Sequence, residues 1–124
     1  IMMRLNEFQD YCKRTMPEPI IDTPSSTIYG EKARTNYAMG IAGEAGEVVD
    51  IVKKEVFHGH LFDRNEIMNE LGDVLHYVAG LAAMYNYTLD EVAAANLNKL
   101  RDRYPDGFSQ EASRNRKDVS NEQG

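Results

Sequence analysis

Four acidic residues form two pairs with the same spacing in the middle of the chain. Glu44 and Glu47 are three residues apart in GEAGEVVDIVKK, and Glu70 and Asp73 are three apart in NELGDVLHY. Residues at this spacing are neighbours on a helix surface, so each pair can direct two carboxylates at one point. Carboxylate oxygens are ligands that Mg²⁺ prefers. The pairs therefore predict a divalent-cation site whose ligands are Glu44, Glu47, Glu70 and Asp73.

Each pair also has an ordinary explanation, because acidic residues at this spacing commonly lie on a solvated helix face. Gly43 and Gly46 beside the first pair each cost a helix about 1 kcal/mol relative to alanine. Their missing side chains leave room for a ligand, or equally for a closely packed second helix. The residues alone leave both interpretations open, although two pairs on consecutive long helices favour the metal site.

Polar residues also interrupt the apolar stripe that follows Thr88. Asn96 falls within this stripe, and Lys99 and Arg103 follow on its edge. Inward polar groups need partners. Asn96 could cap a neighbouring backbone while the cations pair with surface acids. Beside a metal site, the three residues instead predict a clamp for a polyphosphate.

Two further residues share a helix side with the acids. Lys54 lies on the side of Glu47, and Tyr77 follows Asp73 by one turn. We expect Lys54 to contact phosphate oxygens and Tyr77 to contact the substrate, with a position on the rim as the alternative for Tyr77.

Helical periodicity predicts the elements that position these residues. Apolar residues recur at helical spacing over 5–16, 31–57, 67–85 and 89–100. Gly59 is expected to end the second helix, and Asp63 to cap the third. Pro17, Pro19 and Pro24 predict a loop over 17–27, and no strand pair is expected.

These elements predict an all-α, four-helix bundle-like fold with two long central helices and two shorter ones. One domain is expected over residues 1–108, followed by a polar, frayed C-terminal tail over 109–124. The net charge is −6 with no basic block. This argues against a nucleic-acid polymer or an anionic membrane as partner. The lone Cys12 fits a reducing cytoplasm, and no apolar run reaches the length of a membrane span.

Three segments together resemble the MazG-like all-α nucleoside triphosphate pyrophosphohydrolases. They are YAMGIAGEAGEVVDIVKK, NELGDVLHYVAGLA and TLDEVAAANLNKLRDRYPDGF, in the order of the family, from about Tyr37 to Phe108. The family's acids fall on Glu44, Glu47, Glu70 and Asp73. Its Asn, Lys and Arg-Tyr positions fall on Asn96, Lys99, Arg103 and Tyr104. Many members carry an additional glutamate where this chain has Gly43.

The resemblance implies Mg²⁺-dependent hydrolysis of a nucleoside triphosphate to its monophosphate and pyrophosphate, with Mn²⁺ as a substitute ion. It also implies a homo-oligomer, a dimer or a tetramer, and a role in cleansing the nucleotide pool. Glu47 is the carboxylate that we expect to accept the proton of the attacking water. The alternative is a non-catalytic helical module, for oligomerisation or regulation, that keeps the fold.

Overall fold

The computed structural model describes residues 2–122, and these are mostly helical, which confirms the all-α class. Contacts divide the chain into two compact units, one up to Leu89 and the other from Asp90 on. The prediction of one domain over 1–108 stays a prediction. The first unit contains α1 (Leu5–Cys12), the 3-10 helix η1 (Lys13–Thr15), β1 (Ile21–Thr23), β2 (Ser26–Ile28), α2 (Glu31–His58) and α3 (Arg64–Met84). The second unit contains α4 (Leu89–Arg103), α5 (Gln110–Asn115) and α6 (Lys117–Glu122), α4 beginning at the boundary residue.

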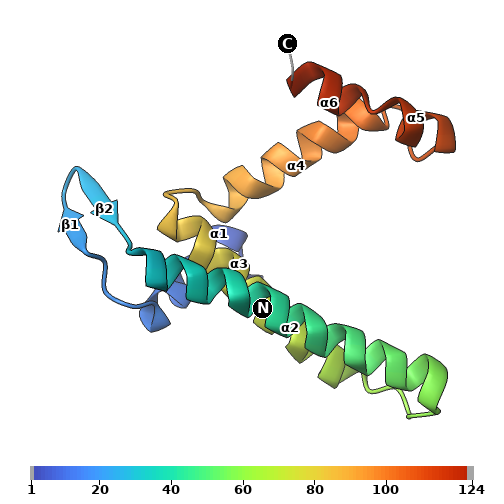
Figure 1. The fold of residues 1–124 in the computed structure, drawn as a ribbon, viewed down its shortest axis with the longest axis horizontal. Coiled ribbons are helices and arrows are strands. Elements are labelled where there is room, and N and C mark those ends of the chain that lie inside the picture. The colour runs from blue at the N-terminus through green and yellow to red at the C-terminus, as the bar shows by residue number, and fades with distance from the viewer. Residues whose placement is uncertain (1, 123–124) are drawn as a thin grey trace. The chain divides into compact units, whose positions relative to one another are not determined.

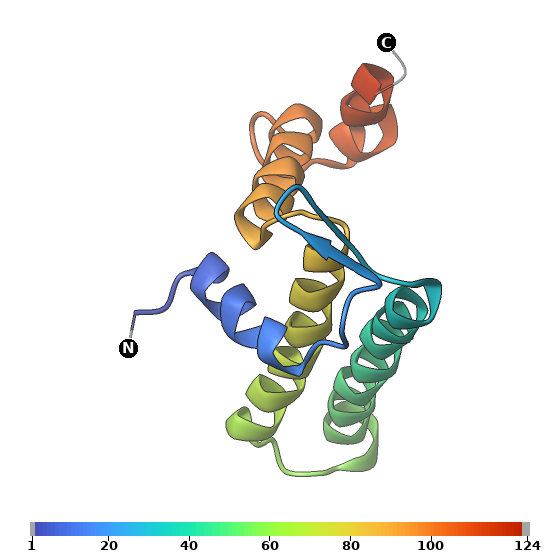
Figure 2. The ribbon, with the colours of Figure 1, turned by 90° about the vertical axis from the view of Figure 1, so that its left-hand side faces the viewer.

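The two longest helices, α2 and α3, form a helical hairpin and lie side by side in both views (Figures 1 and 2). Gly59 ends α2 in the left-handed conformation, at φ 72°, which a glycine adopts without a steric penalty. Asp63 then caps α3, because its side chain accepts a hydrogen bond of 2.9 Å from the amide of Asn65. The predicted end of the second helix and start of the third are confirmed.

Two tyrosine–glycine contacts set the separation of α2 and α3. The ring of Tyr77 lies over Gly40, where an added Cβ would be 2.5 Å from ring carbons, and the ring of Tyr37 lies over Gly80 in the same way. The two rings also meet edge to face, with centroids 5.2 Å apart. Only a residue without a side chain allows a ring to approach the opposite helix this closely.

Helix α1 is fixed to α3 by one buried amide. Gln9, which is 3% exposed, donates to the carbonyls of Ala79 and Tyr87 and accepts from the amide of Leu89. Cys12, Ala79 and Leu89 form the buried apolar cluster beside it. Gln9 therefore links α1 to the backbone at the end of α3 and at the start of α4.

The prediction of a loop without strands over 17–27 is wrong in part. Strands β1 and β2 pair antiparallel, with Ile21 opposite Ile28 and Thr23 opposite Ser26. The prolines flank this hairpin or lie in its turn, so they remove no ladder hydrogen bond. The Thr23 hydroxyl accepts a hydrogen bond of 3.0 Å from the amide of Ser26 and closes the turn.

The expected frayed tail is instead folded through residue 122, as α5 and α6. Ser109 caps α5, because its hydroxyl accepts a hydrogen bond of 3.0 Å from the amide of Ala112. Asp118, in α6, binds the side chain of Arg103. Within the described residues 2–122, every helix is too short or too polar to cross a membrane.

Only part of the apolar pattern predicted over 31–57 contacts α3: Tyr37 belongs to this pattern and is buried against Gly80, whereas the valines further along α2 are exposed. Val49 and Val56 are 63% and 62% exposed, and Val52 is also exposed. The helix contact instead uses the α2 face that carries Tyr37 and Gly40. The periodicity identified the apolar residues of α2, but it does not distinguish those that contact α3 from those that remain exposed.

We predict that Gly40→Ala destabilises the protein although alanine is the better helix former. The new methyl group would overlap the Tyr77 ring, and overpacking of this kind costs about 1–3 kcal/mol. The measurement is thermal unfolding followed by circular dichroism. Gly46→Ala on the same helix is the matched control, since no described atom lies within 4 Å of a Cβ added there. This control should gain about 1 kcal/mol. Equal effects of the two substitutions would contradict the proposed spacing role.

Candidate metal centre

Three carboxylates from two helices meet beside the tyrosine–glycine contacts. Glu44 on α2 and Glu70 and Asp73 on α3 each direct one oxygen into a group whose members all lie within 4.8 Å of one another. Glu44 and Glu70 are half-buried, and Asp73 is exposed. Gly40 precedes Glu44 by one helical turn, and Tyr77 follows Asp73 by one turn. The close approach of the helices at Gly40 and Tyr77 therefore brings the acids together.

The donor set fits a hard divalent cation. At metal–oxygen distances of about 2.0–2.1 Å for Mg²⁺, two oxygens on opposite sides of the ion are about 4.2 Å apart. At about 2.3–2.6 Å for Ca²⁺, they are about 4.6–5.2 Å apart. The separations within this group reach at most 4.8 Å, so small side-chain adjustments allow all three oxygens to contact one ion. All-oxygen ligands suit Mg²⁺, Mn²⁺ or Ca²⁺ better than a soft metal.

The electrostatics of the group favour a bound cation. Partial burial raises the pKa of Glu70 above its ordinary value, and the charges of Asp73 and Glu44, followed by those of Glu47 and Glu66, raise it further. A raised pKa means that the folded protein holds this proton more tightly than the unfolded chain does. Its contribution to stability is full below the ordinary pKa and is lost as the pH rises through the raised pKa. Above the raised pKa the ionised group therefore destabilises the fold, and a bound cation would offset this effect.

Glu47, the fourth predicted ligand and the predicted base, lies outside the oxygen group. It lines a neighbouring cavity of about 200 Å³ together with Glu70 and Lys54. The ammonium group of Lys54 is 2.7 Å from Asp50, and this contact raises the pKa of Lys54. Lys54 therefore lies beside the acids but is engaged by a carboxylate of its own helix. The roles of Glu47 and Lys54 stay predictions.

Tyr77 lies on the other side of the group from this cavity along α3. Its ring contacts those of Tyr37 and His76, with centroid separations of 5.2 and 5.4 Å. The three rings, with Asn36 and Thr15, line a hollow of about 450 Å³. A flat aromatic ligand would find stacking surfaces and polar groups there. The predicted contact of Tyr77 with substrate is compatible with this position and stays a prediction.

The remaining predicted residues belong to the end of α4 and the segment after it. Asn96 and Lys99 are exposed on α4, so the expectation that Asn96 points inward is wrong for the described chain, and Tyr104 follows the helix. Arg103 is paired with Asp118 and also lies over the ring of Tyr104, 5.8 Å from its centroid. The predicted phosphate clamp of Asn96, Lys99, Arg103 and Tyr104 stays a prediction.

Two residues near the acids were not singled out from the sequence. Glu66 adds to the field that raises the pKa of Glu70, and Asp50 binds Lys54. The sequence indicates both interactions through local spacing, because Glu66 precedes Glu70 by four residues and Asp50 precedes Lys54 by four. Such pairs are neighbours on a helix, where like charges repel and opposite charges attract.

Comparison with known proteins identifies the family of the chain. Residues 32–108 match the family model described as the MazG nucleotide pyrophosphohydrolase domain. A similar protein is the "Gene 37 protein" of Mycobacterium phage L5, which is 42% identical over 82 residues, covering 63% of this chain and 72% of that protein. No solved structure matches the chain. All four predicted acids lie within the matched residues.

We predict that Glu70→Gln raises the melting temperature in EDTA at pH 7, because it removes the repelled charge. Differential scanning calorimetry with and without Mg²⁺ measures this. Wild type should gain several degrees on addition of Mg²⁺, by preferential binding to the folded state, and Glu70→Gln should gain less. Glu55→Gln removes the same charge from a position outside the oxygen group and should keep the full Mg²⁺ effect. A Glu70→Gln protein that is stabilised by Mg²⁺ as strongly as wild type would contradict the metal assignment.

Proposed function

Because the chain belongs to the MazG nucleotide pyrophosphohydrolase family, we propose that it is a Mg²⁺-dependent nucleoside triphosphate pyrophosphohydrolase. It would convert a ribo- or deoxyribonucleoside triphosphate to the monophosphate and pyrophosphate. The observation that carries this proposal is the convergence of Glu44, Glu70 and Asp73 on one point within the matched residues. A hydrolase of this kind would serve to cleanse the nucleotide pool in the cytoplasm.

The acidic group would hold the metal and orient the reactants. Glu44, Glu70 and Asp73 provide the three converging oxygens, and Glu47 is the proposed fourth ligand. A bound Mg²⁺ would supply Lewis-acid polarisation of the phosphoryl group and a lowered pKa for water. Mn²⁺ is the expected substitute. The half-buried positions of Glu44 and Glu70 limit the access of water, which strengthens the interaction of their charges with a cation.

Glu47 is our candidate for the general base. It lies outside the converging oxygens but is close enough for its charge to raise the pKa of Glu70. A carboxylate in this position can accept the proton of a water that attacks the α-phosphorus. A ligand that is fully engaged with a metal has less capacity to do so, and for this reason we assign the role to Glu47.

Substrate contacts are proposed for the predicted residues outside the acidic group. We assign the nucleoside to the hollow at Tyr77, on the basis of its aromatic walls and its position one turn from Asp73. Positive and amide groups would bind phosphate oxygens and stabilise the charge of the leaving pyrophosphate. These residues are Lys54, Asn96, Lys99, Arg103 and Tyr104.

We also propose that the protein is a homo-oligomer, a dimer or a tetramer. Large apolar side chains are exposed along both long helices, and they include Val49, Val56, Met68 and Leu71. An exposed apolar surface of this extent is typical of a protein that binds a partner, and a second copy of the chain would cover it. The proposed partners exclude nucleic-acid polymers and membranes, in keeping with the net charge of −6.

We expect wild type to release pyrophosphate from at least one member of a panel of ribo- and deoxyribonucleoside triphosphates in Mg²⁺, and to stop in EDTA. Chromatography of the nucleotide products and a pyrophosphate assay measure this. Glu70→Gln should abolish turnover while circular dichroism shows unchanged helicity, and Glu55→Gln is the matched control that should retain activity. Absence of turnover across the whole panel would favour the non-catalytic helical module instead.

The Glu47→Gln variant tests whether Glu47 acts as the general base or as a metal ligand. If Glu47 is the base, kcat should fall by roughly 10²–10⁴-fold, because general base catalysis contributes about this much. Binding of Mg²⁺, measured by calorimetric titration, should change much less than it does in Glu70→Gln. A loss of Mg²⁺ binding as large as that of Glu70→Gln would assign Glu47 to the metal and leave the base elsewhere.

A further inference from the structure

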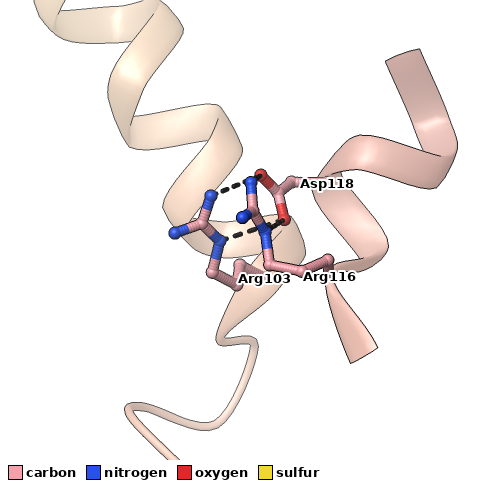
Figure 3. A network of polar contacts seen from close by, with 3 residues as sticks. All are labelled: Arg103, Arg116 and Asp118. Carbon is pink, nitrogen blue, oxygen red and sulfur yellow. Dashed lines mark hydrogen bonds and ion pairs between the residues drawn. The ribbon is translucent and has the colours of Figure 1, made fainter. Parts of the chain in front are cut away.

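Arg103 is held by a carboxylate from beyond the matched domain. Asp118 accepts a hydrogen bond of 3.0 Å from Nε of Arg103 and one of 2.7 Å from its Nη2, so the pair is bidentate (Figure 3). The side chain of Asp118 is 2% exposed, whereas that of Arg103 is 25% exposed. The match to the MazG domain ends at residue 108, so Asp118 lies outside it.

The backbone between α5 and α6 places this carboxylate next to Arg103. Arg116 has a positive φ of 46°, in the left-handed region that arginine seldom adopts. Its guanidinium also binds Asp118, with Nε and Nη2 each 3.3 Å from a carboxylate oxygen (Figure 3). One buried carboxylate is thus enclosed by two arginines, and the left-handed residue turns the chain so that α6 can begin beside α4.

The geometry leaves Arg103 able to bind a second anion. A guanidinium has five N–H donors, and Asp118 accepts from two of them, at Nε and Nη2. Both donors of Nη1 and the second donor of Nη2 are not used by this carboxylate, and beside Asp118 the guanidinium also interacts with the side chain of Tyr104. Two arginines against one aspartate also give the cluster a net positive charge. A phosphate could therefore bind the outer edge of Arg103 while Asp118 keeps the inner edge.

We propose that Asp118 is a positioning residue, which fixes the guanidinium of Arg103 so that its outer edge binds the phosphates of the substrate. This inference rests on the proposed function, because it takes Arg103 as a phosphate ligand. A latch that blocks Arg103 until substrate displaces it is the competing role for the same contact. The burial of Asp118 and its hydrogen bonds favour positioning, because displacement of Arg103 would remove its two hydrogen bonds, the shortest of the four, from a buried charge.

The test is a double-mutant cycle on the full chain. Inorganic pyrophosphate in the presence of Mg²⁺ is titrated calorimetrically into wild type, Asp118→Asn, Arg103→Gln and the double variant. Asp118→Asn should weaken binding on the order of tenfold, as expected for loss of a charge-assisted contact. The same substitution should have little effect in the Arg103→Gln background, because a positioning residue acts only through the side chain that it holds. Glu111→Gln, which removes a negative charge from the same segment, is the matched control and should bind as wild type.

Each other result overturns the proposal. Tighter binding of pyrophosphate by Asp118→Asn than by wild type identifies a latch. An equal loss of pyrophosphate affinity in both backgrounds identifies a purely structural role. If wild type binds no pyrophosphate, Arg103 is not a phosphate ligand. Asp118→Glu replaces Asp118→Asn in the cycle if circular dichroism shows that the asparagine variant does not fold, with the same criteria. Turnover measured on the same samples distinguishes the two hypotheses. A wild type that binds pyrophosphate with the expected cycle but hydrolyses no nucleotide retains the positioning role and loses only the proposed reaction.

Discussion

The convergence of like charges between α2 and α3 is the constraint on which the candidate site depends. Carboxylates that repel one another move apart unless the backbone fixes their positions. Here the contacts that fix the backbone lie one helical turn from the acids. Tyr77 over Gly40 and Tyr37 over Gly80 draw the helices together. The acids at Glu44 and Asp73 must follow, because each is four residues from one of these contacts. Packing between uncharged groups thus enforces an electrostatically unfavourable cluster, as functional sites often require.

Local sequence signals were sufficient to predict most of the helices and where they end. Gly59 and Asp63 act within a few residues of their own positions, so their effects on the ends of α2 and α3 could be predicted from spacing alone. The acid pairs were predictable for the same reason, since neighbours at three residues share a helix surface. That Glu44 meets Glu70 and Asp73 required the further assumption of an antiparallel hairpin, which the short connection between the helices supports.

Features that depend on long-range contacts could not be predicted in this way. The Tyr37–Gly80 and Gly40–Tyr77 contacts join positions about forty residues apart, and neither residue type marks its partner in the sequence. The exposure of Val49 and Val56 could not be predicted either, because periodicity identifies an apolar face but not what covers it. Asp118 lies in a polar segment, and its role depends on a contact with Arg103 that local spacing does not indicate.

The contrast between two carboxylates supports the proposal that the acidic group binds a cation. Hydrogen bonds from Arg103 and then Arg116 hold the pKa of Asp118 well below its ordinary range, so its buried charge is satisfied within the fold. Burial and neighbouring acids instead raise the pKa of Glu70. The nearby cation Lys54 is bound to Asp50. The carboxylates of Glu44, Glu70 and Asp73 converge where this cation is already engaged, which is the reason that we propose a metal ion as their partner. A small hard ion that also binds a polyphosphate would neutralise the carboxylates and the substrate at the same point.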